Sequence, residues 1–185
     1  MFLLIAIVVG FAAGLITGGR PHNLLRLNLR WNGLIFLALA VQVVISTGWL
    51  PGGPTLVRVL YVLSNLVGIL WLGRNIRLRG IPCVLLGSVS NLLAIVANGG
   101  RMPVDGALLS PARLSQLPTN RVLVTAQTHL AWLGDRFLLG HPFPLPTVFS
   151  IGDLLIGAGI VWLIAVGMRP PARVSASPSN PSLAA

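Results

Sequence analysis

Five long apolar stretches divide this chain, and arginines fill alternate connections between them. A helix needs about 20 mostly apolar residues to cross the hydrocarbon core of a bilayer, within a range of about 17–25. Such a stretch has to be helical, because its backbone finds no water to bond in lipid. We therefore predict an all-α fold, an integral membrane bundle of five transmembrane helices in a single domain, residues 1–168. The predicted spans are residues 2–18, 32–50, 55–72, 81–97 and 149–168.

The amino-acid composition is also typical of a chain that lies in a membrane and not in water. Charged residues make up 9% of the 185 residues and the mean hydropathy is +0.86, whereas a soluble domain carries about 25% charged residues. The net charge is +10, and every basic residue is an arginine. In a soluble protein this charge would suggest nucleic acid as the partner. Because the arginines flank apolar stretches, we expect the lipid bilayer and its anionic headgroups as partners, and no nucleic acid.

The arginines also predict the orientation of the chain. Three regions contain arginine and no acid, namely the connections at residues 19–31 and 73–80 and the tail at residues 169–185. The positive-inside rule assigns such regions to the cytoplasm. The N-terminus then lies outside and the C-terminus inside, and residues 98–148 form a partly helical extracytoplasmic segment.

Residues 121–139 leave a second topology open, because they are long enough to cross a membrane. They contain Asp135 and two arginines, and a charged group at the bilayer centre costs about 2.5–3.5 kcal/mol on insertion scales. A sixth span would also move the basic tail outside. We therefore prefer five spans, with residues 121–139 as a lid, an interfacial helix or a re-entrant segment.

We expect a transmembrane helix at the start of the sequence and a disordered cytoplasmic tail at its end. No basic region precedes the first apolar stretch and no small-residue cleavage site follows it, so we expect a retained first helix. Residues 169–185 are rich in Pro, Ser and Ala, a composition typical of a disordered tail.

Within the extracytoplasmic segment we predict two short helices. Residues 110–117 begin with Ser-Pro, which favours a helix start. Residues 121–133 carry leucines at helical spacing and predict the second helix, although the β-branched Val122 and Val124 leave a strand as the alternative. The prolines of residues 140–146 favour an extended run.

Polar side chains within the predicted spans have two interpretations. Arg58 and Asn65 share a face of the third span, and Asn91 lies in the fourth. Amides in a membrane usually join helices, at about 0.6 kcal/mol per pair, and the alternative is a polar pocket inside the bundle. The first span carries a doubled G-x-x-x-G motif, which predicts a close-packing face within the chain, in a homo-oligomer or with a membrane partner; its members are Gly10, Gly14 and Gly18.

Two motifs lie at the predicted outer ends of spans. The motif N-G-G-R-M-P-V, residues 98–104, suits a helix end, where glycine turns the chain and a cation complements the dipole. The motif F-S-I-G-D, residues 149–153, suits a capping box at a helix start. Arg58, Arg101 and Asp153 share one predicted level, so we expect Asp153 to pair with Arg58 or Arg101.

With a third pattern between them, T-H…L-G-D at residues 128–135, these motifs resemble an uncharacterised family of small bacterial multi-pass membrane proteins, one of the families with a domain of unknown function. The resemblance covers nearly the whole chain. It implies a place in the bacterial cytoplasmic membrane and no established activity, so it carries over no catalytic residue.

No constellation for catalysis or metal binding is visible in the sequence. The patterns H-E-x-x-H, G-x-S-x-G and the P-loop are absent, and the single cysteine, Cys83, fits a buried thiol. We expect no enzyme, cofactor or metal, and predict a non-enzymatic accessory or scaffold protein. The alternative is a component that binds or transports a small ligand at an outer-face site capped by residues 98–148, with arginines favouring an anionic ligand. The candidate polar cluster is Arg58, Asn65, Asn91, Asn98, Arg101, His129, Asp135 and Asp153.

Overall fold

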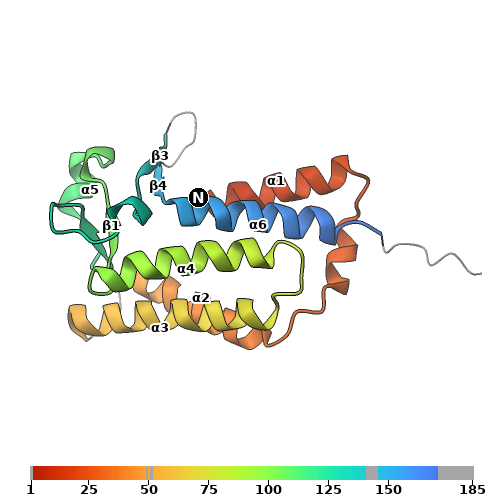
Figure 1. Ribbon diagram of the computed structural model, residues 1–185, viewed down its shortest axis with the longest axis horizontal. Coiled ribbons are helices and arrows are strands. Elements are labelled where there is room, and N and C mark those ends of the chain that lie inside the picture. Colours follow the sequence, from red (N-terminus) through yellow and green to blue (C-terminus); the bar gives the residue numbers. More distant parts are fainter. Residues whose placement is uncertain (1, 49, 51, 141–145, 171–185) are drawn as a thin grey trace, which may run out of the picture.

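The structure of the protein is a computed structural model, which describes residues 2–48, 50, 52–140 and 146–170. Its main feature is a bundle of five longer helices that run side by side, with a smaller segment of strands and short helices at one end (Figure 1). Each longer helix coincides closely with one predicted apolar stretch, so the mostly helical fold is confirmed. The helices are α1 (Phe2–Ile16), α2 (Asn32–Thr47), α3 (Gly53–Arg74), α4 (Ile81–Ala97) and α6 (Ile151–Gly167).

The lengths of these helices do not support five transmembrane spans. In the described part of the chain, only α3, with 22 residues, is long and apolar enough to cross a membrane. The other four are apolar helices of 15 to 17 residues. At about 1.5 Å per residue they reach roughly 22–26 Å, against about 30 Å of hydrocarbon. α1 and α2 stop before their apolar stretches end, because Gly18 and Gly48 turn the chain in left-handed geometry, with φ of 76° and 71°.

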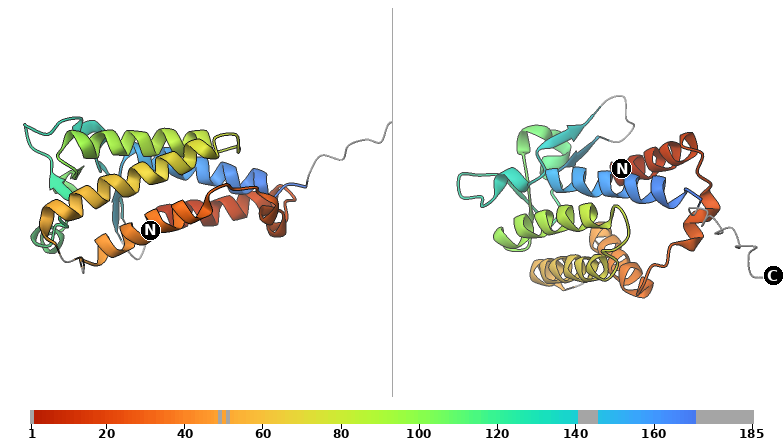
Figure 2. Two further views of the ribbon diagram at one scale, coloured as in Figure 1. Left: turned by 90° about the horizontal axis from the view of Figure 1, so that it is seen from below. Right: turned by 45° about the vertical axis from the view of Figure 1, so that its right-hand side comes forward.

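α6 packs closely between α1 and α4 (Figures 1 and 2). A Cβ at Gly87 of α4 would collide with the backbone oxygen of Gly152 in α6. On the other side, a Cβ at Gly10 of α1 would lie 3.1 Å from the nearest side chain of α6, and Gly14 also faces the end of α6. Gly18 lies in the turn after α1 and meets nothing within 4 Å. The first two glycines of the motif therefore pack within the chain, and its use between chains stays a prediction.

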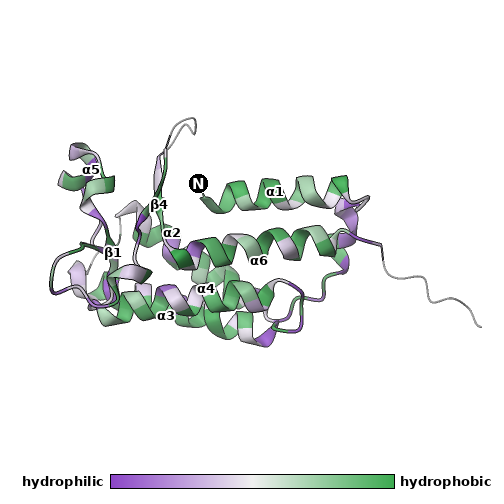
Figure 3. Cartoon of the chain, turned by 45° about the horizontal axis from the view of Figure 1, so that its top comes forward, coloured by the Kyte–Doolittle hydropathy of each residue, from purple (hydrophilic) through white to green (hydrophobic). Residues whose placement is uncertain are grey.

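The outside of the bundle is apolar along its length. Figure 3 shows hydrophobic residues along all five helices and hydrophilic residues mostly at the two ends. Leu4, Phe36 and Leu70, from three helices, are 65%, 68% and 65% exposed. Exposed apolar surface of this extent marks a site of contact with a membrane or another protein.

The two ends of the bundle are built from different parts of the chain. At one end lie a 3-10 helix, η1 (Pro21–Arg26), the connection between α3 and α4, and the end of α6 (Figure 1). At the opposite end lie the start of α1, the end of α2 and the segment between α4 and α6. The described parts of the three regions whose charged residues are all arginine thus meet at one end.

The segment between α4 and α6, residues 98–150, is called the β segment below. β1 (Met102–Val104) pairs in parallel with β2 (Arg121–Leu123), and Val104 also forms a bridge with Asp135. β3 (Phe137–Leu139) and β4 (Thr147–Phe149) form an antiparallel pair. Short helical turns connect these strands, namely η2 (Gly106–Leu108), α5 (Pro111–Ser115) and η3 (Ala131–Leu133).

The β segment corrects one prediction. The expected helix over residues 121–133 is wrong, and the alternative strand at Val122 is confirmed. The backbone of residues 121–123 bonds to β1, and a turn follows in which the Thr125 amide donates to Thr128 Oγ1 at 2.8 Å. No helix in residues 121–139 is long enough for the sixth span.

Other predictions for this region have mixed outcomes. The short helix predicted over residues 110–117 is confirmed as α5. Residues 141–145 of the expected extended run lie outside the described residues, as does most of the predicted tail.

Candidate functional site

A cavity of about 480 Å³ lies inside the bundle and is closed at one end by the β segment. Residues from α2, α3, α4 and α6 form its walls, and β1, β2 and β4 contribute to its closed end. Its polar lining residues are Gln42, Tyr61, Ser64, Asn65, Ser88, Asn91, Asn120, Arg121, Asp135 and Asp153.

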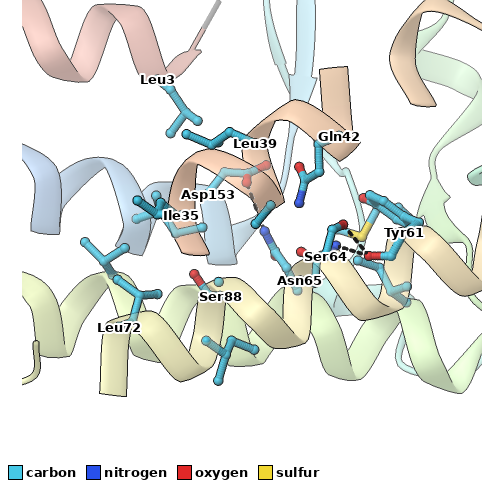
Figure 4. A pocket seen from close by; sticks show the side chains of 18 of the residues that line it. Leu3, Ile35, Leu39, Gln42, Tyr61, Ser64, Asn65, Leu72, Ser88 and Asp153 are labelled. Atoms are coloured by element: carbon cyan, nitrogen blue, oxygen red, sulfur yellow. Dashed lines mark hydrogen bonds between the residues drawn. The ribbon is translucent and has the colours of Figure 1, made fainter. Parts of the chain in front are cut away.

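The cavity is polar towards the β segment and apolar towards the opposite end. On α3, Leu72 lies about three turns after Tyr61 and about two turns after Asn65, and Figure 4 shows the same order. On α6, Asp153 lies near the β segment, whereas Leu163 lines the far end. The cavity therefore offers an amphipathic environment, with hydrogen-bonding groups at one end and hydrocarbon at the other.

Asp153 is held by a network that joins α4 to the start of α6. Asn91 Nδ2 donates to Asp153 Oδ1 at 2.9 Å, and Ser150 Oγ donates to Asn91 Oδ1 at 2.8 Å. Ser150 and Asp153 also form the predicted capping box, in which each side chain accepts the other's backbone amide at 3.0 Å. Ser150 is fully buried. The carboxylate is thus oriented by neutral donors.

The expected ion pair of Asp153 with Arg58 or Arg101 is not formed. Among the described residues, the carboxylate of Asp153 has no arginine partner, and the ion pair of the site is a different one. Arg58 instead lies under the glycine turn that follows α4, where a Cβ at Gly100 would be 3.1 Å from Arg58 Cβ. Within the described residues, the buried Nε atoms of Arg58 and Arg101 have no hydrogen-bond partner. Neither residue lines the cavity.

Asp135 is the second carboxylate of the cavity, and it is only 3% exposed. Its backbone is fixed by hydrogen bonds with Pro103 O at 2.8 Å and from the Asp105 amide at 3.0 Å. Arg121 Nη2 lies 3.4 Å from its Oδ2. Burial raises the pKa of Asp135 to about 7, against a lowering by Arg121 and a further rise from Asp153. Asp135 can therefore exchange a proton near neutral pH.

The N-G-G motif ties the β segment to α4. Asn98 Nδ2 donates to the backbone oxygens of Ala94 and His129, both at 2.8 Å, and Asn98 Oδ1 accepts from the His129 amide at 3.1 Å. These bonds use the backbone of His129 and not its imidazole. Asn98 and His129 are thus structural contacts at the edge of the site, outside the cavity lining.

Four of the eight candidate residues line the cavity, namely Asn65, Asn91, Asp135 and Asp153. The eight candidates did not include Arg121 and Ser88, which also line the cavity. Ser88 lies one turn before Asn91 on the same helix, so the helical spacing was the available signal. Arg121 carried no local signal, because its place depends on the pairing of β2 with β1.

Metal-ligating side chains do not gather in the part of the chain that the structure describes. The described residues contain no group of three or more His, Cys, Asp or Glu side chains that could hold a metal ion. Cys83 donates from Sγ to the Leu155 oxygen at 3.2 Å, as expected of a thiol packed between α4 and α6.

The fold and the cavity define the class of this protein as a helical bundle with apolar outer faces and a partly polar interior cavity. The chain belongs to a family of unknown function, DUF5317, which it matches over residues 26–165. No curated protein matches the chain. No solved structure matches it either.

Proposed function

We propose that the chain is an integral protein of the bacterial cytoplasmic membrane whose bundle binds a small ligand in the cavity. The observation that carries the proposal is the amphipathic cavity of about 480 Å³ with two carboxylates near its closed end. A scaffold protein, the leading expectation from the sequence, would need no such space. The ligand-binding alternative is therefore the better supported of the two.

The membrane part of the proposal rests on the surface of the bundle. Large apolar side chains are exposed on the outer faces of the longer helices, and the arginine-only regions meet at one end. We infer that all five longer helices cross the membrane, with the arginines in the cytoplasm. Four of them are short, which a bilayer accommodates by local thinning.

The charges at the cavity favour a ligand with a cationic head. Arg121 is paired with Asp135, whereas Asp153 accepts hydrogen bonds from Asn91 and the Ser150 amide, both neutral. A primary amine on the ligand could complete the coordination of Asp153 with a charge-assisted hydrogen bond. The anionic ligand expected from Arg58 and Arg101 is disfavoured, because neither arginine reaches the cavity lining.

Three probes with the same six-carbon body test this ligand class, namely hexylamine, hexanol and hexanoate. Each is added to the purified full chain in detergent, and the shift of the thermal unfolding midpoint is recorded. We expect the largest stabilisation from hexylamine and the smallest from hexanoate. Equal shifts from all three, or the largest from hexanoate, would contradict the proposed class.

Two variants on one helix locate the probe. Ser88→Leu extends a side chain into the cavity, and Ser90→Leu is the matched control because Ser90 does not line it. We expect Ser88→Leu to weaken the apparent affinity for hexylamine, taken from the thermal shifts, at least tenfold. Ser90→Leu should change this affinity by less than a factor of two. An equal loss in both variants would place the probe elsewhere.

Cysteine labelling tests the membrane part independently. In a Cys83→Ala background, Arg113→Cys reports on the β segment and Arg77→Cys on the opposite end. We expect a membrane-impermeant maleimide to label position 113 in spheroplasts and position 77 only after permeabilisation. Labelling of both positions in intact spheroplasts would contradict the proposed topology.

A further inference from the structure

A second pocket, of about 350 Å³, lies at the end of the bundle opposite the β segment. It is formed by η1, the connection between α3 and α4, and the end of α6, which lie side by side (Figure 2). Four arginines from these three regions line it, and its apolar lining comes from four further side chains. The arginines are Arg26, Arg77, Arg79 and Arg169, and the apolar residues are Leu27, Leu78, Leu163 and Val166.

The backbone around this pocket is firmly held. Asn23, 5% exposed, donates from Nδ2 to Met168 O at 2.9 Å, and the Arg20 amide donates to the same oxygen at 2.7 Å. These bonds fix η1 against the end of α6. The absence of a side chain at Gly167 makes room for Leu27, which would lie 3.2 Å from a Cβ there.

A second buried asparagine fixes the other wall. Asn75, 4% exposed, accepts from the Arg30 amide at 2.8 Å and donates to the Arg30 oxygen at 3.0 Å. It therefore joins the connection after α3 to the segment after η1. The arginines thus project from a framework that is assembled before any ligand arrives.

The charge of this pocket is not compensated within the described residues. Its four arginines form no ion pair there. The three acids of the chain are Asp105, Asp135 and Asp153, all in the β segment or at the adjoining start of α6. The negative end of the α6 dipole suits Arg169, but it does not explain arginines from two other regions. The pocket therefore favours a compact anion with several acceptor oxygens.

We propose that this pocket binds the phosphate group of an anionic membrane lipid. Guanidinium groups match the geometry of phosphate oxygens with paired hydrogen bonds. The leucines and Val166 offer an apolar surface beside the arginines, along which the first carbons of the lipid chains can lie. The lipid source rests on the membrane placement proposed above. The pocket shares Leu163 with the cavity, but none of its four arginines lines the cavity.

Native mass spectrometry of the full chain, released from detergent with added lipid, tests the proposal. The probes are phosphatidylglycerol, the zwitterionic phosphatidylcholine and inorganic phosphate. We expect phosphatidylglycerol to bind at least tenfold more tightly than phosphatidylcholine. Inorganic phosphate that competes with phosphatidylglycerol at equal concentration would overturn the lipid as the source.

Two double variants separate the pocket from general charge. Arg77→Gln with Arg79→Gln removes two pocket arginines, whereas Arg20→Gln with Arg30→Gln removes the same charge from the same end outside the pocket. We expect the first pair to weaken phosphatidylglycerol binding at least tenfold and the second less than threefold. Equal weakening would overturn the site. Should the first double variant fold poorly, the single variant Arg169→Gln, at an exposed position, gives the same comparison with Arg20→Gln. We expect Arg169→Gln to weaken phosphatidylglycerol binding at least threefold and Arg20→Gln to leave it unchanged.

Discussion

Asn91 of α4 donates a hydrogen bond of 2.9 Å to Asp153 of α6, across 62 positions of the chain. The same amide accepts from the fully buried Ser150 at 2.8 Å. A single side chain thus serves the carboxylate of the cavity and the cap of the last helix.

Replacing this amide should destabilise the bundle. Asn91→Ala removes two hydrogen bonds and leaves the Ser150 hydroxyl buried without its acceptor, so we expect the free energy of unfolding to fall by about 1–3 kcal/mol. Thermal unfolding in detergent measures the change. Ser90→Ala, one residue earlier, is the control and should alter stability by less than about 0.5 kcal/mol. Similar losses in both variants would show that the network contributes nothing specific.

The contact of α4 with α6 should tolerate no side chain at its closest point. A Cβ at Gly87 would collide with the Gly152 oxygen. We therefore expect Gly87→Ala to lower the free energy of unfolding by about 1–3 kcal/mol, the usual cost of overpacking. Gly73→Ala in α3 is the matched control, because nothing lies within 4 Å of a Cβ there. The control should be neutral or stabilise by up to about 1 kcal/mol, since alanine favours helix over glycine. A Gly87→Ala variant as stable as the control would mean that the helices separate easily.

Asp135 should make stability depend on pH. Burial raises its pKa in the folded chain to about 7, from an ordinary value of 3.8, so the folded state binds more protons than the unfolded state between these values. Its contribution to stability is therefore complete below about pH 4 and is lost as the pH rises to about 7. Unfolding midpoints measured from pH 4 to 8 should fall with rising pH more steeply for the native chain than for Asp135→Asn. Identical slopes would contradict the raised pKa.

Asn98 should hold the β segment against α4. Asn98→Ala removes three hydrogen bonds, two of them to the backbone of His129, and we expect a loss of about 1–3 kcal/mol. Hydrogen exchange should rise around residues 129–135 and not in α3. Asn28→Ala, at an exposed position in the opposite end, should leave the exchange unchanged. Unchanged exchange in Asn98→Ala would mean that strand pairing alone holds the segment.

Hydropathy predicted the positions of the longer helices well, because apolar stretches of this length are too long for a typical strand and favour helices. The boundary of α4 agrees with its predicted stretch at both ends. The capping box at Ser150 and Asp153 was also predictable, since it depends on residues three positions apart.

The β segment and the cavity depended on contacts that are remote in sequence. Leucine spacing suggested a helix over residues 121–133, but the pairing of Met102 with Arg121 favours a strand at its start. The same pairing of β2 with β1 places Arg121 next to Asp135, where the two form an ion pair. The sequence predicted an arginine of similar depth as the partner of Asp153, but the structure places the side-chain amide of Asn91 there. Together with the Ser150 backbone amide, this neutral donor satisfies the carboxylate at the helix start.

The brevity of four helices has a consequence for the surroundings of the molecule. If the bundle crosses the membrane as proposed, only α3 among the described helices matches a full hydrocarbon thickness, and neighbouring acyl chains would have to compress or splay around most of the perimeter. Deformation of this kind carries an elastic penalty for each ångström of mismatch. Membranes with shorter fatty acids should therefore accommodate this bundle more readily. Two copies that lie edge to edge would share one region of thinned bilayer instead of making two.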